Sequence, residues 1–188
     1  ISDMHMIPGQ QKKIDFMHSL AALEPDLVMN TGDNLSHVDG MGPLLEALDP
    51  LMDFPGVFVP GSNCYFAPVF KNPARYLWQP RTPQMIEEGS RVALPIERMH
   101  DAFESRGWTG LVNRYDTLNL KGLRLEFSGV DDPHLRYDEH PGFAPGAFDE
   151  GQEPSVRIGV AHAPYMRTLH RFVQDGAQAI FAGHTHGG

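Results

Sequence analysis

The sequence predicts an α/β fold, and three observations carry that prediction. Segments with a helical hydrophobic period alternate with short apolar segments through the first half of the chain. Further along, two apolar segments flank a Lys-Gly pair, which is typical of an antiparallel hairpin. The short apolar segments run into glycine and polar residues, and α/β proteins place their chemistry at such strand ends.

The individual elements follow from hydrophobic periodicity and from the positions of turn residues. The first helix, for example, places Ile14, Met17, Leu20 and Ala21 on one face. In chain order we expect a helix over 10–23, a strand over 27–30, a helix over 44–51, a strand over 57–59, a helix over 96–106, hairpin strands over 115–120 and 123–130, a strand over 156–161, a helix over 165–173 and a strand over 179–182. The intervening residues 131–154 contain several prolines and glycines, and we expect an irregular loop there.

The composition fits one domain over residues 1–188, since 41% of these residues are hydrophobic and suffice for one core. Ile1 and Ser2 look like the tail of a strand, and the chain stops directly after a candidate site. We therefore expect a fragment that lacks the start of the first strand and the end of the domain. The apolar runs are far shorter than the roughly 18 residues of a membrane span, so we expect a cytoplasmic or membrane-associated protein.

Charge and cysteine content exclude several classes of function. A net charge of -9 argues against general nucleic-acid binding, which depends on a basic surface. Cys64 is the single cysteine, which rules out an internal disulfide framework and a multi-cysteine zinc site. Position 70 is Phe70, so Cys64 does not fit the phosphatase pattern of cysteine, five residues and arginine.

Residues 64–94 form a segment in which aromatic and basic residues interleave with prolines, and we expect an ordered loop or flap. Its aromatic residues are Tyr65, Phe66, Phe70, Tyr76 and Trp78, and its basic residues include Lys71, Arg75 and Arg81. Two interpretations stay open. These side chains line a pocket for an anionic, partly apolar substrate, or they form a side cluster that holds the loop to the body.

Five polar clusters stand at the ends of the predicted strands. They are Ser2-Asp3-Met4-His5, Gly32-Asp33-Asn34, Gly61-Ser62-Asn63, Ala161-His162-Ala163 and Gly183-His184-Thr185-His186. Each cluster alone has a plainer interpretation, such as a helix cap, an Asx turn or a satisfied core histidine. Together on one sheet edge they would leave several buried carboxylates and imidazoles without partners unless a cation supplies them. We therefore predict a metal centre.

The types of ligand narrow the choice of metal. Mixed aspartate and histidine ligation suits Mn, Fe or Zn better than calcium, which prefers oxygen ligands alone. The clusters hold enough ligands for two ions. Two ions about 3.5 to 4 Å apart suit in-line hydrolysis of a phosphoester.

The order DMH, GDN, GSN, H and GHTH resembles the calcineurin-like metallophosphoesterases, whose pattern is D-x-H, G-D, G-N-H-D/E, H and G-H-x-H. The resemblance spans residues 3–186, and the local wording is most similar to a bacterial branch of membrane-associated phosphodiesterases of the YkuE type. It implies a sandwich of two mixed β-sheets flanked by helices. It also implies dinuclear, metal-dependent hydrolysis of phosphodiesters or phosphomonoesters by a metal-bridging hydroxide.

The resemblance also implies a role for each ligand. One ion is expected on Asp3, His5 and His186, the second on His162 and His184, and Asp33 is expected to bridge both. We expect Asp33, Asn63 and His184 to take part directly in catalysis.

One block departs from the family pattern. The family has G-N-H-D/E where this chain has Gly61, Ser62, Asn63 and Cys64. Ser62 thus replaces a ligand asparagine, and Asn63 replaces a histidine credited with binding phosphate or protonating the leaving group. The Asn63 side-chain amide is not an acid at neutral pH, so it cannot transfer a proton to the leaving group.

Two ways of filling the missing ligand position at the second metal stay open. We expect the side-chain oxygen of Asn63 to bind the second metal, whereas Ser62 with water would fill that place more weakly. A general acid would have to come from elsewhere, with His37 and His134 as candidates, or the leaving group departs unaided. Cys64 is expected to be a plain loop residue rather than a soft metal ligand.

These observations leave two functions in competition. The first is a two-metal phosphoesterase acting on a phosphoester small molecule or a phospholipid-like substrate, with peripheral membrane contact as a further expectation. The second is a catalytically weak metal-binding or phospholipid-binding module, because the GSNC block is altered.

Overall fold

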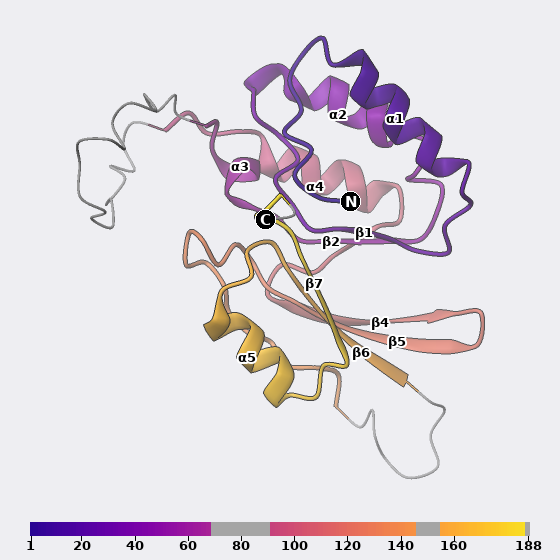
Figure 1. Cartoon of the computed structure of the whole chain (residues 1–188), viewed down its shortest axis with the longest axis vertical. Coiled ribbons are helices and arrows are strands. Elements are labelled where there is room, and N and C mark those ends of the chain that lie inside the picture. The colour runs from indigo at the N-terminus through magenta and orange to yellow at the C-terminus, as the bar shows by residue number, and fades with distance from the viewer. Residues whose placement is uncertain (69–90, 146–154, 187–188) are drawn as a thin grey trace.

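The computed structural model describes residues 1–68, 91–145 and 155–186. Two β-sheets lie face to face, with helices on the outer face of each (Figure 1). The α/β sandwich that the sequence predicts is therefore confirmed.

The first sheet has three strands in the order β1-β2-β3 and is parallel throughout. These strands are β1 (Val28–Asn30), β2 (Gly56–Phe58) and β3 (Thr109–Gly110). The start of the chain runs beside β1, because the backbone N–H of Thr31 donates to the carbonyl of Ile1, and that of Asp3 donates to Gly32. No strand is assigned at Ile1 and Ser2, so the strand tail expected there is present only as this hydrogen-bonded stretch.

The second sheet has four strands in the order β4-β5-β6-β7. They are β4 (Arg114–Leu120), β5 (Leu123–Gly129), β6 (Ser155–Ala161) and β7 (Ala179–Ala182). β4 and β5 form the predicted antiparallel hairpin, and the other two pairs are parallel. The carboxyl ends of β5, β6 and β7 therefore meet at one edge of the sheet.

The helices divide between the two outer faces (Figure 1). They are α1 (Gln11–Ala21), the 3₁₀ helix η1 (Val38–Gly40), α2 (Met41–Leu48), α3 (Ser62–Tyr65), α4 (Ile96–Ser105) and α5 (Met166–Gln174). α1, α2 and α4 cover the first sheet, and α5 covers the second. The predicted helix over 44–51 begins earlier and ends earlier than expected, because residues 49–54 form turns.

Three hydrophobic clusters fill the three interfaces between these layers. Ile14 of α1, Leu44 of α2 and Phe103 of α4 belong to the cluster between the helices and the first sheet. Val57 and Phe127 belong to the cluster between the two sheets, and α5 contributes Phe172 to a smaller third cluster. Burial of these side chains fixes the sheets against each other and thereby fixes the positions of their strand ends.

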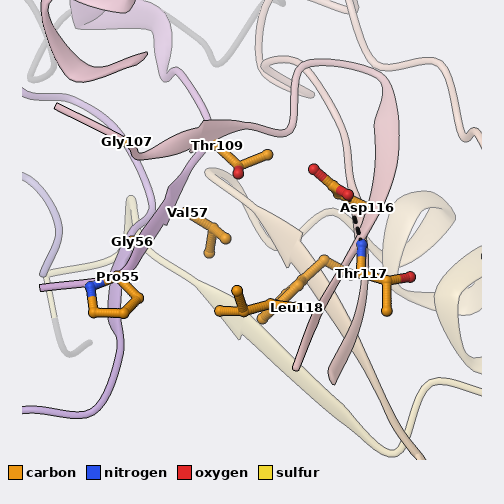
Figure 2. Close-up of a pocket in the computed structure, with 9 residues that line it drawn as sticks. Pro55, Gly56, Val57, Gly107, Thr109, Asp116, Thr117 and Leu118 are labelled. Atoms are coloured by element: carbon orange, nitrogen blue, oxygen red, sulfur yellow. Dashed lines mark hydrogen bonds between the residues drawn. The ribbon is translucent and has the colours of Figure 1, made fainter. Parts of the chain in front are cut away.

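A small pocket lies between the sheets, where Pro55 and Gly56 at the start of β2 approach Thr117 and Leu118 of β4 (Figure 2). It is at the opposite end of β2 from Gly61. The backbone N–H of Thr117 donates to the Asp116 carboxylate at 2.7 Å within its wall. None of the predicted ligands lines this pocket.

Candidate metal centre

The predicted ligands lie at the carboxyl ends of parallel strands from both sheets. Asp33 follows β1, His162 follows β6, and His184 follows β7. Backbone bonds connect these ends, since Gly183 N–H donates to the His162 carbonyl at 2.8 Å. His184 N–H donates to Asp3 Oδ2 at 2.9 Å, which joins the last strand to the first residues of the chain.

The side chains form two groups, each of which could hold a metal ion. Asp3, His5 and His186 form one group, and Asp33, His162 and His184 form the other. Within each group the ligand atoms lie within 4.8 Å of one another. The grouping coincides with the two ligand sets that the sequence resemblance implies.

Asp33 connects the two groups. Its Oδ2 lies 3.2 Å from His162 Nε2 and 3.9 Å from His5 Nε2. His5 Nε2 is also 3.9 Å from Asp3 Oδ1, so it belongs to the first group. A single carboxylate therefore faces both groups, which is the arrangement that a bridging ligand needs.

The backbone at these residues is held in an unusual conformation. Five ligand candidates have positive φ: Asp3 at 53°, His5 at 45°, Asp33 at 52°, His184 at 72° and His186 at 52°. Non-glycine residues in this region cost about 1–3 kcal/mol each and persist only where the surrounding structure holds them. Such strain is concentrated at functional sites, and here the five strained residues all belong to the two ligand groups.

Hydrogen bonds orient two of the imidazoles. His162 Nδ1 lies 2.8 Å from the Thr31 carbonyl, which only an N–H can bond, so Nε2 carries the lone pair that faces Asp33 when the ring is neutral. His5 Nδ1 lies 3.0 Å from Ser36 Oγ, leaving Nε2 directed at Asp3 and Asp33. Bonds of this kind fix the ring orientation of metal-binding histidines.

Burial makes this collection of groups costly unless a cation joins them. Asp33 is 2% exposed and His162 is fully buried. Asp3 Oδ1 is buried with no hydrogen-bond partner, and it lies 3.5 Å from His186 Nε2. An orphaned carboxylate oxygen among imidazoles is what a metal ion satisfies, so the residues present fit the predicted metals.

The pKa shifts reflect the same burial and pairing. Burial alone would raise the pKa of Asp33, but interaction with a protonated His162 and hydrogen bonds from Asn63 lower it below the ordinary value. Burial opposes a charge on His162, yet the neighbouring Asp33 carboxylate raises its pKa. Burial, and then the nearby His162 and His134, lower the pKa of His184. Asp33 is thus anionic and His184 neutral near pH 7, which are the forms that bind metal.

The family model for calcineurin-like phosphoesterases matches residues 1–188. The chain belongs to this family. No curated protein gives a match to the sequence. Membership in the calcineurin-like phosphoesterases indicates a hydrolase that cleaves phosphoesters with the help of metal ions.

Asn63 occupies the position where this chain departs from the calcineurin-like pattern, and it bonds Asp33 twice. Its backbone N–H donates to Oδ1 and its side-chain Nδ2 donates to Oδ2, both at 2.8 Å. Metal ligation through Asn63 Oδ1 therefore requires the side-chain amide to turn over. The assignment of Asn63 as a metal ligand, with Ser62 as the alternative, stays a prediction.

The two candidate general acids lie in different surroundings. The ring of His134 lies 5.2 Å from that of His184, centroid to centroid, and its Nδ1 is 2.9 Å from the Tyr165 hydroxyl. His37 instead caps η1 by accepting a hydrogen bond from the backbone N–H of Asp39. The structure therefore brings His134, and not His37, into contact with a ligand candidate.

Sequence reasoning missed the pair Asp131 and Asp132, which follow β5 and were assigned only to a loop. Asp131 is 8% exposed and Asp132 is fully buried. Burial raises the pKa of Asp132 to about 6, and backbone bonds from His134 and Leu135 only partly offset this. The signal in the sequence was DDPH directly after a predicted strand, the same pattern that marked the other clusters.

Cys64 is a buried core residue of α3 and not the plain loop residue that the sequence predicts, because the short helix turns its side chain into the interior. Its Sγ accepts hydrogen bonds from the backbone and side chain of Asn34 at 3.4 and 3.8 Å. Burial raises the pKa of the thiol to about 11. It therefore stays protonated near pH 7 and is neither a nucleophile nor a ready metal ligand.

Most of the aromatic and basic segment lies outside the described residues, including Phe70, Tyr76, Trp78, Lys71, Arg75 and Arg81. Tyr65 and Phe66 are described, with ring centroids 6.3 Å apart. None of the helices in residues 1–68, 91–145 and 155–186 combines the length and apolar character that crossing a bilayer requires.

Proposed function

We propose that this chain hydrolyses phosphodiesters or phosphomonoesters with a pair of metal ions. One ion is assigned to Asp3, His5 and His186, and the other to His162 and His184, with Asp33 shared between them. The observation that carries the proposal is the buried Asp33 carboxylate facing both groups. Family membership supports it independently.

The residues of the chain prepare the site for this chemistry. Asn63 donates to both carboxylate oxygens of Asp33, and His162 Nε2 lies 3.2 Å from Oδ2, so both oxygens have fixed directions. Bound metal ions supply a nucleophile at neutral pH and charge that stabilises the phosphoryl oxygens. Because Asn63 cannot donate a proton in the usual place, esters with acidic leaving groups such as nitrophenol are expected to react best.

Loss of His184 is expected to reduce hydrolysis of bis(4-nitrophenyl) phosphate by at least about a hundredfold, because even partners of a ligand cost 10- to 100-fold. The experiment compares kcat/KM of His184→Ala with that of wild type after loading with Mn, Fe or Zn. His170→Ala is the matched control, since His170 is exposed on α5. Full turnover in His184→Ala, or in a metal-stripped sample of the wild type, would contradict the proposal.

The alternative function is a catalytically weak module that binds metal or phospholipid. The bonds from Asn63 to Asp33 favour it, because the side-chain amide is engaged as a donor and not as a ligand. On this alternative the double variant Ser62→Asn with Asn63→His, which restores the family wording, gains phosphoesterase activity over a wild type that binds metal without turnover. If the double variant gains no phosphoesterase activity, that result counts against the alternative.

The proposals on branch, substrate and membrane contact rest on the local sequence of the motifs. Membership of the YkuE-type branch, a phospholipid-like substrate and contact with a membrane surface are part of the proposal on that ground. Release of phosphate or headgroup from phospholipid vesicles tests them together. An enzyme that cleaves nitrophenyl esters and leaves vesicles intact would exclude the lipid substrate while leaving the hydrolase proposal in place.

A further inference from the structure

Tyr65 makes a hydrogen bond that connects two distant segments beside the second ligand group. It is the last residue of α3, two positions after Asn63. Its hydroxyl donates to the Asp131 carboxylate, with distances of 2.7 Å to Oδ1 and 2.8 Å to Oδ2. Asp131 is 66 residues away along the chain and follows β5. A phenol bonded to a carboxylate is a strong, charge-assisted contact.

On the α3 side, the connection leads directly to the shared carboxylate. Asn63 lies in the same turn of helix as Tyr65 and bonds both oxygens of Asp33. α3 is only four residues long, and a helix of that length has little stability of its own. Its position therefore depends on contacts such as the one that Tyr65 makes.

On the Asp131 side, the connection leads to His184 of the second ligand group. Asp131 Oδ1 also accepts the backbone N–H of Asp132 at 2.6 Å. The Asp132 carboxylate in turn accepts the backbone N–H groups of His134 and Leu135, each at 3.1 Å. These bonds shape the turn over residues 131–135, and the ring of His134 then packs against His184.

The contacts form a closed circuit, here called the ring of contacts, around the second ligand group. His184 Nδ1 is 3.3 Å from His162 Nε2, and His162 Nε2 is 3.2 Å from Asp33 Oδ2. Asp33 is bonded to Asn63, which returns the path to α3. The bond between Tyr65 and Asp131 joins α3 to the turn over residues 131–135 and so completes the ring of contacts. The ring of Tyr137 packs edge-on against Tyr65 at 5.5 Å, which limits movement of the phenol.

We propose that Tyr65 is a positioning residue for the second metal ion, holding α3 and the turn over residues 131–135 at a fixed separation through Asp131. The proposal rests on the proposed two-metal function and names a residue on which its second ion depends. The first ligand group, Asp3, His5 and His186, meets these contacts at Asp33 and at the backbone N–H of His184, which donates to Asp3 Oδ2, and it does not include the His184 side chain. Tyr65 therefore affects the second ion far more than the first.

Tyr65→Phe tests this because it removes the hydroxyl and keeps the ring that packs on Tyr137. Isothermal titration of metal-free protein with Mn²⁺ measures each binding event separately. We expect about a tenfold loss of affinity for the second ion, at the low end of the 10- to 100-fold range for partners of ligands because Tyr65 acts through two segments. Affinity for the first ion is expected to stay within about twofold of wild type.

Tyr115→Phe is the matched control, since Tyr115 lies on β4 and is 45% exposed. It is expected to bind both ions as the wild type does. Asp131→Asn is a second variant that keeps an oxygen acceptor but loses the charge, and we expect a smaller loss at the second ion than in Tyr65→Phe. Wild-type affinity for the second ion in Tyr65→Phe would overturn the inference, as would equal weakening of both ions with a lowered melting temperature.

The same titration separates this inference from the proposed function. A wild type that binds two ions but hydrolyses no phosphoester overturns the hydrolase proposal and leaves the role of Tyr65 open to the same comparison of variants. A wild type that binds only one ion overturns both. A wild type that binds two ions and turns over, with Tyr65→Phe unchanged at the second ion, overturns only the role of Tyr65.

Discussion

Asp33→Asn is expected to lose at least one metal ion and to hydrolyse phosphoesters about a thousandfold more slowly, which corresponds to about 4 kcal/mol of transition-state stabilisation. Asp33 faces both ligand groups and is almost fully buried, so loss of its charge weakens both groups at once. An amide in that position also places an NH₂ group against the donors of Asn63, because only one of its two terminal atoms accepts hydrogen bonds.

The measurement for Asp33→Asn is kcat/KM with a nitrophenyl ester, together with the metal content of the same preparation. Asp39→Asn serves as the control, since the Asp39 side chain is 77% exposed and the substitution removes an equal charge. A variant at Asp33 that keeps two ions and wild-type turnover would show that this carboxylate does not bridge.

Gly61→Ala is expected to destabilise the protein by about 3 kcal/mol, the upper part of the range for overpacking a filled interior. A Cβ at position 61 would collide with Asp33 Oδ1 and would lie 2.6 Å from the His162 ring. Both neighbours are buried and bonded, so neither can move without disturbing the ligand group. We therefore expect loss of the second ion as well as a fall in the free energy of unfolding.

Gly42→Ala provides a control of opposite sign for the same chemical change. Gly42 lies inside α2, and a Cβ added there meets nothing within 4 Å. Alanine is favoured over glycine in the middle of a helix by roughly 0.5–1 kcal/mol, and Gly42 stands in the first turn of α2, so this variant is expected to gain up to that amount of stability. Thermal unfolding checks both variants, and a Gly61→Ala protein with the wild-type melting temperature and metal content would contradict the steric argument.

Much of the fold follows from the sequence because its long elements carry strong patterns. The periodic residues Ile14 and Met17 predict α1, and the Lys121-Gly122 pair marks the turn between β4 and β5. The elements that were missed are short. β3 has two residues and α3 has four, too few for any hydrophobic period to appear. Tertiary contacts, such as the bond from Tyr65 to Asp131, fix these elements in place.

The candidate site, like the fold, could be predicted from the sequence only in part. The strand-end clusters and their order predict Asp3, His5, Asp33, His162, His184 and His186 as ligands, and the structure brings these side chains together. Their division into two groups follows from the family resemblance. The sequence could not show that Asn63 directs an amide N–H at Asp33, because side-chain orientation depends on the folded backbone. Nor could it pair Asp131 with Tyr65 across 66 residues.

The central claim is that one buried carboxylate serves two metal ions, and metal stoichiometry tests it most directly. The protein is stripped of metal, reconstituted separately with Mn, Fe and Zn, freed of loosely bound ions and analysed for metal per chain. Two ions per chain, falling to one or none in Asp33→Asn, is the expected result. One ion or none in the wild type with every metal would contradict the claim.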